Sequence, residues 1–155
     1  MILYLDTSAL VKRYIAEPGT HEVAQAIGDA EVSGTSMIAR AEMAAALAKA
    51  VRMNVLTRDA AAAALQMFRN EWPRLVRVQV TEFLVARADN LAWELGLRGY
   101  DAVHLASALL WQEGVDAAVA FATFDQRLWE AAGQCGLSVL PVDLPALITT
   151  WRTEA

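Results

Sequence analysis

Four acidic residues stand where carboxylates can do chemistry: Asp6, Glu42, Asp101 and Asp125. Asp6 directly follows the apolar run at 2–5, and Asp125 lies two residues beyond the apolar segment VAFAT. Because parallel sheets bind ligands at the carboxyl ends of their strands, these two acids are expected at one sheet edge. Gathered carboxylates raise each other's pKa and cannot all ionise without a cation. The pattern therefore favours a site for Mg²⁺ or Mn²⁺, hard ions that prefer oxygen ligands, and such sites typically serve phosphodiester cleavage.

Glu42 and Asp101 do not follow a predicted strand, and their sequence neighbours are what single them out. Glu42 is the only acid between Glu31 and Asp59, and the alanine-rich helix around it would let a backbone or an ion approach closely. Asp101 follows a Gly-Tyr step near the first turn of another helix. Both acids are therefore candidates to complete a metal site with the two acids at the strand ends.

Each acid also has a purely structural explanation. Asp101 suits an N-cap or first-turn position, where it interacts with the helix dipole. Asp6 and Asp125 suit caps for the helices that follow their strands. Glu42, taken alone, suits an ion pair with a nearby basic residue, Arg40 or Lys49. The convergence of all four acids is what favours the metal site over these alternatives.

Short apolar segments alternate with amphipathic ones along the chain. Strands are predicted at 2–5, 32–36, 75–80, 115–123 and 137–142. Helices are predicted on either side of Pro18-Gly19, and then over 37–53, 57–72, 81–96, 100–114 and 124–134. Ser36, Thr57 and Thr81 are of the residue type that caps the helices after them. This alternation indicates a parallel sheet covered on both faces, in one domain spanning residues 1–155.

The composition excludes several classes of protein. Of the 155 residues, 56% are hydrophobic and 20% are charged, which is typical of a folded domain and not of a disordered tail. No apolar stretch reaches the roughly 18 residues of a membrane span, and no signal-peptide pattern opens the chain. The single Cys135 cannot form an intrachain disulfide and is expected to be a partly buried thiol. A cytoplasmic protein without membrane association is expected.

The formal net charge of −5 argues against nucleic-acid binding through a blanket of positive charge. Two divalent cations among the four acids would add four positive charges and leave −1. Lys12, Arg13 and Arg40 lie close in sequence to two of the acids and are candidates for phosphate contacts, although ordinary solvated charges are the simpler interpretation of each. The charge therefore does not exclude an RNA substrate.

Four segments resemble, in the right order, the motifs of PIN-domain ribonucleases, and most closely those of VapC-type toxins of bacterial toxin–antitoxin pairs. They are DTSALVKRYIAEPG, the AEM step, RGYDAVHLASAL and ATFDQRLWEAAGQCGLSVLP. The resemblance extends from Met1 to about Val142 and so covers nearly the whole chain. Any one of these motifs is weak evidence, but the ordered set is specific.

Position by position, the four acids resemble the four metal-binding acids of that family, and Ser8 or Thr123 resembles the hydroxyl residues that support its site. The resemblance implies a three-layer α/β/α sandwich with a mainly parallel sheet. It also implies a hydrolase, an endoribonuclease dependent on Mg²⁺ or Mn²⁺. In this mechanism, Asp6, Asp101 and Asp125 hold metal, while Glu42 completes the cage or orients the attacking water. The implied partners are RNA, a second copy of the chain, and a VapB-type antitoxin whose C-terminal segment blocks the site.

The two histidines and most tryptophans are expected to have structural or surface roles. His104 follows Asp101 by one turn on an Ala/Leu-rich helix, where packing is the simpler interpretation than a place in the site. His21 is expected at the surface. The tryptophans at 72, 93, 111 and 129 lie on predicted helices with apolar neighbours, which favours core or subunit packing for most of them over stacking on bases.

Two other functions compete with the nuclease. A catalytically inactive module with the same fold would act only through its antitoxin and would bind no divalent metal. Phosphotransfer on an aspartate also begins from an acid at a strand end. It is disfavoured because Asp6-Thr7-Ser8 lacks the second acid two residues on that a phosphatase of the haloacid-dehalogenase kind would have.

Overall fold

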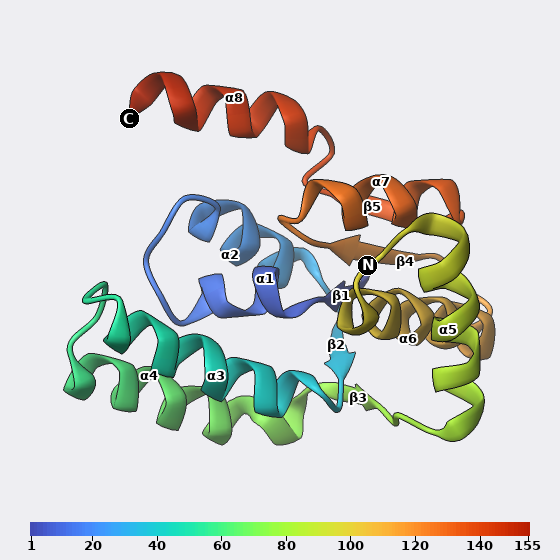
Figure 1. The fold of residues 1–155 in the computed structure, drawn as a ribbon, viewed down its shortest axis with the longest axis horizontal. Coiled ribbons are helices and arrows are strands. Elements are labelled where there is room, and N and C mark those ends of the chain that lie inside the picture. The colour runs from blue at the N-terminus through green and yellow to red at the C-terminus, as the bar shows by residue number, and fades with distance from the viewer.

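Five parallel strands form the centre of the computed structural model, which describes residues 1–155 (Figure 1). They lie in the order β3-β2-β1-β4-β5. Their bounds are Ile2–Leu5 for β1, Val32–Ser36 for β2, Val76–Val78 for β3, Val119–Ala122 for β4 and Ser138–Leu140 for β5. The register pairs Leu3 of β1 with Ser33 of β2 on one side and with Ala120 of β4 on the other. The most apolar strands, β1 and β4, are thus neighbours in the interior of the sheet.

Eight helices connect and cover the strands. They are α1 (Thr7–Leu10), α2 (Thr20–Asp29), α3 (Ala39–Arg52), α4 (Arg58–Glu71), α5 (Glu82–Leu95), α6 (Gly99–Val115), α7 (Gln126–Gln134) and α8 (Leu144–Glu154). Short 3₁₀ turns follow α1 and α4. None of the helices combines the length and the unbroken hydrophobicity that crossing a lipid bilayer requires.

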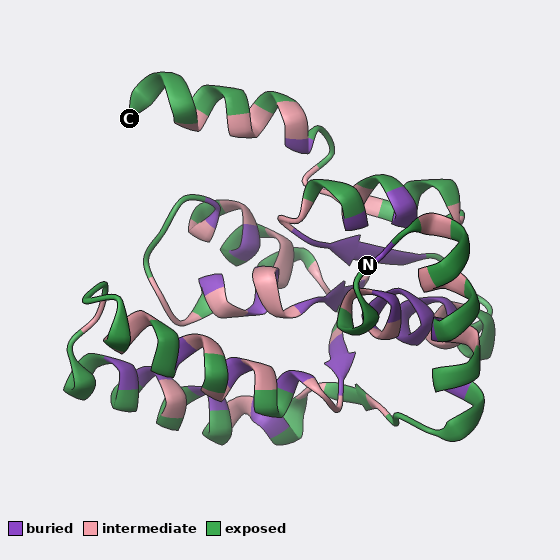
Figure 2. Cartoon of the chain, viewed as in Figure 1, coloured by how far each residue is buried: buried purple, intermediate pink, exposed green.

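Successive side chains of β1 point to opposite faces of the sheet and so divide the core in two. Tyr4 packs with Phe121 and with buried residues of α5, α6 and α7. Leu3 and Leu5 pack on the other face with α1, α2, α3 and α4. Figure 2 shows the buried strands in the middle of the molecule and exposed outer faces on most helices. The three-layer α/β/α sandwich is therefore confirmed.

Most predicted elements are present, with local shifts at their ends. Thr57 and Thr81 cap α4 and α5 as predicted, each accepting a hydrogen bond from a backbone N–H of the first turn. The prediction that Ser36 caps α3 is wrong, because that helix begins at Ala39 and its N-cap is Ile38. The predicted strand 115–123 is too long: α6 continues through Val115, and β4 begins only at Val119. The sequence analysis did not predict α8.

The chain changes direction across the sheet at the β1–β4 pair. From β1 the order continues through β2 to β3 on one side, whereas β4 and β5 lie on the other. Parallel sheets open a crevice at such a point, outside the carboxyl ends of the two strands. Asp6 follows the end of β1, and Asp125 follows the end of β4. The topology therefore brings these two acids to the same crevice.

Close packing of α6 on β2 gives a direct test of this architecture. A Cβ added at Gly34 would lie 2.8 Å from the Trp111 ring and 3.0 Å from the Val76 carbonyl oxygen. Gly34→Val is therefore expected to lower the free energy of unfolding by about 1–3 kcal/mol, as overpacking does. Urea unfolding followed by circular dichroism measures this loss.

The matched control is Gly28→Ala, on α2, where an added Cβ meets nothing within 4 Å. Its free energy of unfolding is expected to stay within about 1 kcal/mol of wild type, with any change toward greater stability because alanine favours a helix. Equal stability of the Gly34→Val variant and the wild type would contradict the packing described for α6 and β2.

Candidate active site

The carboxylate of Asp6 is buried at the end of β1 and accepts three hydrogen bonds. Its Oδ1 accepts from the Ser8 hydroxyl at 2.7 Å and from the Ala9 backbone N–H at 2.9 Å, and its Oδ2 accepts from the Thr123 hydroxyl at 2.6 Å. Through the Ala9 bond, Asp6 caps α1. The structural explanation for this acid therefore holds, and the two supporting hydroxyls expected from the sequence, Ser8 and Thr123, both contact it.

Burial raises the pKa of Asp6, although His104 and the hydroxyls of Thr123 and Ser8 act in the opposite direction. Desolvation disfavours the charged form, and hydrogen bonds to the carboxylate favour it. A positive charge close to Asp6 would act in the same direction as the hydrogen bonds and keep the acid ionised at neutral pH. The position thus favours a cation beside Asp6.

Glu42 projects from the first turn of α3 toward the same crevice. Its Oε1 accepts from the Thr7 hydroxyl at 2.7 Å and from His104 Nε2 at 2.6 Å. Its ion-pair partner is His104, so the alternative of an ion pair with Arg40 or Lys49 is wrong. Burial alone would raise the pKa of Glu42, but the hydrogen bond and the charge of His104 outweigh it, and the pKa is lowered. Glu42 is therefore held as a carboxylate.

The imidazole of His104 is buried, as expected from its apolar helix, but it also holds Glu42. Nε2 of His104 faces a carboxylate, which can only accept, so Nε2 must carry the proton and donate. In the neutral ring the other nitrogen, Nδ1, is then the acceptor. The hydroxyl of Tyr4 lies 2.7 Å from Nδ1, and burial raises the pKa of Tyr4 well above its ordinary value, which keeps this hydroxyl protonated. Tyr4 thus donates to His104, and His104 donates to Glu42.

Asp101 and Asp125 share one cationic partner, Arg98. Nε of Arg98 donates to Asp101 Oδ2 at 3.0 Å, and Nη2 donates to Asp125 Oδ2 at 2.7 Å. Asp101 lies in the first turn of α6, one of the two structural positions considered for it. It is not the N-cap residue, which is Arg98. Asp125 caps α7, its Oδ1 accepting from the Leu128 N–H at 2.9 Å.

Hydrogen bonds connect three of the acids, Asp6, Asp125 and Asp101, and the neighbour of Asp6 in the chain holds the fourth. The Thr123 hydroxyl that donates to Asp6 also accepts from the backbone N–H of Asp125, at 3.1 Å. Thr7, which follows Asp6 in the chain, holds Glu42, while Arg98 joins Asp125 to Asp101. Glu42 is thus joined to the other three acids only through the peptide bond between Asp6 and Thr7.

The donor set fits a divalent cation in its chemistry. Carboxylate and hydroxyl oxygens are the ligands that Mg²⁺ and Mn²⁺ prefer. The guanidinium of Arg98 between two of the carboxylates shows that this pair attracts positive charge. No three histidine, cysteine or acidic side chains stand close enough together to enclose an ion. Arg98 pairs with Asp101 and Asp125, and His104 donates a hydrogen bond to Glu42.

A groove of about 870 Å³ opens at this network. Four charged residues line one edge of the groove: Glu42, Asp89, Arg98 and Asp101. Its walls are apolar and include Val80, Val85, Ala88, Ala92 and Val103. Tyr100, which is exposed, also lines it. The groove is large enough for a segment of a polymer, and it ends at two of the four acids.

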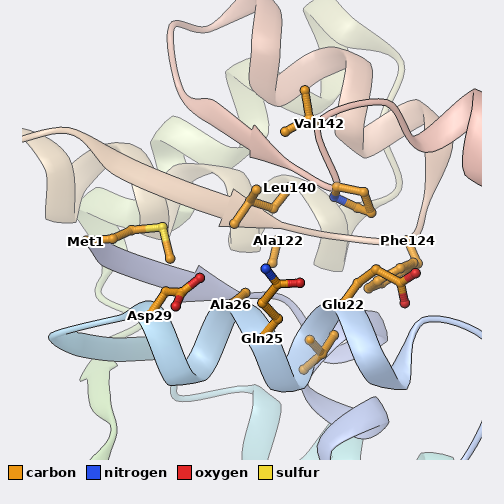
Figure 3. Close-up of a pocket in the computed structure, with 11 residues that line it drawn as sticks. Met1, Glu22, Gln25, Ala26, Asp29, Ala122, Phe124, Leu140 and Val142 are labelled. Carbon is orange, nitrogen blue, oxygen red and sulfur yellow. The ribbon is translucent and has the colours of Figure 1, made fainter.

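A second cavity lies away from the acids, between α2 and the ends of β4 and β5. Figure 3 shows Gln25 and Ala26 of α2 facing Leu140 and Val142 across it, with Met1 at one end. Its volume is about 330 Å³, and none of the four acids lines it. We therefore place the candidate site at the larger groove.

The three basic residues proposed for phosphate contacts interact with other side chains. Lys12 is buried, pairs with Glu17 at 3.0 Å and lies over the Phe124 ring. Arg13 pairs with Glu71 at 3.0 Å. The cation of Arg40 lies over a tryptophan ring. The idea that these side chains line the RNA site finds no support in these contacts.

The tryptophans are mostly structural, as expected. Trp72 is buried, Trp111 packs against the apolar core, and Trp129 donates to the Pro141 carbonyl at 2.7 Å. Trp93 is the exception, since 89% of it is exposed. His21 is exposed and Cys135 is partly buried, both as predicted.

Three residues of the network were missed by the sequence analysis: Tyr4, Thr7 and Arg98. Thr7 was the easiest to find, because it stands between Asp6 and Ser8 in the same motif. Arg98 precedes Asp101 by three residues, a spacing that allows an ion pair on a helix. Tyr4 carries no local signal, since it is one aromatic residue within an apolar strand.

Comparisons with known proteins identify the family of this chain. The PIN domain family model matches residues 3–134. Ribonuclease VapC49 of Mycobacterium tuberculosis (strain ATCC 25618 / H37Rv) is 36% identical over 144 residues, which cover 92% of this chain and 97% of the relative. Ribonuclease VapC47 of Mycobacterium tuberculosis (strain CDC 1551 / Oshkosh) is 31% identical over 140 residues, covering 87% of this chain and 93% of the relative.

Solved structures share the fold at lower sequence identity. A toxin–antitoxin complex from Klebsiella pneumoniae aligns with a TM-score of 0.62 at 17% identity, over 91% of this chain and 98% of the other. VapBC2 from Rickettsia felis, bound to a DNA fragment from its promoter, aligns with a TM-score of 0.59 at 16% identity, over 90% of this chain and 97% of the other. The chain therefore belongs to the PIN-domain family, together with the VapC-type ribonucleases that it resembles in sequence.

Proposed function

We propose that this protein is an endoribonuclease that depends on Mg²⁺ or Mn²⁺ and is the toxin of a toxin–antitoxin pair. The observation that carries the proposal is the position of the four acids around the crevice between β1 and β4, where the ligands of parallel sheets bind; three of them are joined by hydrogen bonds, and Thr7, next to Asp6, holds the fourth. Family membership supports the ribonuclease activity, because the relatives at 36% and 31% identity are ribonucleases by name. The reaction is hydrolysis of a phosphodiester bond that leaves a 5′-phosphate and a 3′-hydroxyl.

In this proposal Asp6, Asp101 and Asp125 hold the divalent ion, directly or through water. The chemistry supplied by a bound divalent ion is activation of the attacking water and stabilisation of charge on the phosphate. Glu42 is held by Thr7 and His104 with one oxygen, Oε1, so its other oxygen is available to complete the ion site or to orient water. Burial by the apolar residues of β1 keeps Asp6 in place.

The proposed substrate is argued from the same groove, and the proposed partners from the family. We assign RNA to the groove that ends at Glu42 and Asp101. The solved structures that share this fold include toxin–antitoxin complexes, which supports a cognate antitoxin for this chain. We propose that the C-terminal segment of such an antitoxin covers the acids, and that the toxin is a homodimer.

The first test is the substitution Asp6→Asn. It preserves the size of the side chain and an acceptor for Ser8 and Ala9, but it removes the negative charge that the ion requires. RNA cleavage in Mg²⁺ or Mn²⁺ is expected to fall by about 100-fold or more, the scale seen when a main electrostatic group is removed. Gel analysis of a labelled RNA measures the cleavage rate.

The control is Asp59→Asn, the same change in an exposed acid on α4 that does not line the groove. It is expected to cleave RNA like the wild type. Mn²⁺ should also raise the melting temperature of the wild type and of the control but not of Asp6→Asn, since a ligand stabilises the state that binds it. Equal cleavage by Asp6→Asn and the wild type would remove the proposed site, and no Mn²⁺ binding by the wild type would favour the inactive module.

The second test concerns the support of Glu42. Replacing His104 by leucine removes the donor at 2.6 Å from Glu42, and Tyr4→Phe removes the hydroxyl that orients the ring. Loss of a group that orients a metal ligand typically costs about 10- to 100-fold in metal affinity or activity. We expect a loss of that size for His104→Leu and a smaller one for Tyr4→Phe, measured by Mn²⁺ titration calorimetry and by cleavage.

His104→Gln separates positioning from packing. Its amide N–H can donate to Glu42 whereas leucine cannot, so Gln is expected to restore part of the Mn²⁺ affinity even if it packs less well. Melting temperatures of all three variants, taken without metal, report the packing contribution. A His104→Leu variant with wild-type Mn²⁺ affinity and cleavage would show that His104 has only a structural role.

A further inference from the structure

Arg98 combines high exposure with two contacts to the acids of the site. Its side chain is 77% exposed, whereas those of Asp101 and Asp125 are 21% and 25% exposed. Its backbone is the N-cap of α6, but its side chain makes no capping hydrogen bond. Arg98 therefore contributes little to the core or to helix capping, and its contacts with the two carboxylates need another explanation.

The oxygens that Arg98 holds are the ones a cation would need. Oδ1 of Asp125 is committed to the cap of α7, which leaves Oδ2 as its available oxygen, and Arg98 Nη2 lies 2.7 Å from that atom. Arg98 Nε likewise holds Oδ2 of Asp101. An ion that binds Asp125 through Oδ2 must therefore compete with the guanidinium.

The competition favours a divalent ion. A charge of +2 interacts more strongly with two carboxylates than the single charge of a guanidinium does, and an exposed ion pair is weakened by solvent and salt. Displacement of Arg98 breaks no packing in the core, because most of its side chain is in contact with solvent. The acids can thus exchange one cation for another without rearrangement of the fold.

A guanidinium released from the two acids would still lie in the groove to which we assign the RNA. Arg98 lines the groove together with Glu42 and Asp101, and it is the only basic residue there. A planar guanidinium offers two parallel N–H donors to a phosphate, a geometry that an ammonium group lacks. The backbone of RNA supplies such a phosphate next to the bond that is cleaved.

We propose that Arg98 is a built-in counter-ion of Asp101 and Asp125, that a divalent ion displaces it, and that it then binds a backbone phosphate of the RNA. This inference rests on the proposed ribonuclease function and adds a residue to it. Arg98 thereby couples metal loading to substrate binding, because the guanidinium becomes available for phosphate only when the ion has taken its place.

Two measurements on Arg98→Ala test the two halves of the inference. Without RNA, the variant is expected to bind Mn²⁺ roughly five- to tenfold more tightly than the wild type, because the competing cation is gone. Isothermal titration calorimetry measures this affinity. At saturating Mn²⁺, KM for RNA is expected to rise by about tenfold with a smaller change in kcat, because a charged hydrogen bond to phosphate is lost.

Arg98→Lys and Arg87→Ala complete the set. Lysine keeps the positive charge but lacks the two parallel N–H donors of a guanidinium. The Mn²⁺ affinity of Arg98→Lys is therefore expected near that of the wild type, while its KM for RNA stays raised. Arg87 on α5 pairs with Glu113 through two hydrogen bonds and touches none of the four acids. Its removal is expected to leave Mn²⁺ affinity and KM unchanged, which controls for general loss of positive charge.

The outcomes separate this inference from the proposed function. If the wild type binds Mn²⁺ and cleaves RNA while Arg98→Ala matches it in Mn²⁺ affinity, the counter-ion role is wrong and the ribonuclease stands. An unchanged KM in Arg98→Ala overturns the phosphate contact in the same way. If the wild type neither binds Mn²⁺ nor cleaves RNA, the proposed function fails and the inference about Arg98 fails with it.

Discussion

The burial of one carboxylate, that of Asp6, is the constraint on which the rest of the site depends. A charge removed from water is costly unless hydrogen bonds or an opposite charge compensate it. Here three donors, two hydroxyls and one backbone N–H, converge on Asp6 from α1 and from the end of β4. The same hydroxyls accept from backbone N–H groups, Ser8 from Phe124 and Thr123 from Asp125. Satisfying Asp6 therefore fixes the turn after β1 against the turn after β4.

Two of the acids that we propose as metal ligands, Asp6 and Asp125, also have a structural use. Asp6 and Asp125 each cap the helix that follows their strand, and each does so through a single oxygen, Oδ1. The cap fixes the orientation of the carboxylate and leaves Oδ2 directed to another partner, the Thr123 hydroxyl in one case and Arg98 in the other. A helix cap and a ligand are thus compatible roles, and the cap supplies the orientation that a ligand requires.

The four acids are compensated in three different ways. Hydrogen-bond donors serve Asp6, an imidazole and a hydroxyl serve Glu42, and one exposed guanidinium serves the other two. The difference in exposure has a consequence for binding. Groups buried with their acid, such as His104, stay in place and orient it, whereas an exposed guanidinium can leave. In an acidic chain whose nearby Lys12 and Arg13 are paired with other acids, the RNA binding that we propose would depend on a bound ion and on Arg98.

Much of the fold follows from local pattern. The apolar runs at β1 and β4 predict buried parallel strands, and the threonines at 57 and 81 cap their helices because their side chains satisfy N–H groups that no carbonyl can reach. Errors arose where two local preferences compete. The segment after Gly114 is apolar enough for a strand, but α6 continues to Val115 and ends at Asp116, which has a positive φ of 50°. Helix α8 begins beyond the last predicted strand and packs mainly through Leu144 and a stacked Phe124–Trp151 pair.

The sequence by itself determined which acids stand at strand ends and helix starts, because those positions depend on neighbours a few residues away. Only the tertiary structure decided what each acid contacts. Glu42 meets His104 across 62 positions of sequence, and Arg98 meets Asp125 across 27. Such pairs depend on the strand order and on the side of the sheet where α6 packs, and neither is encoded in a local pattern. The physical reason is that hydrogen bonds and ion pairs act over a few ångströms in space, whatever the separation along the chain.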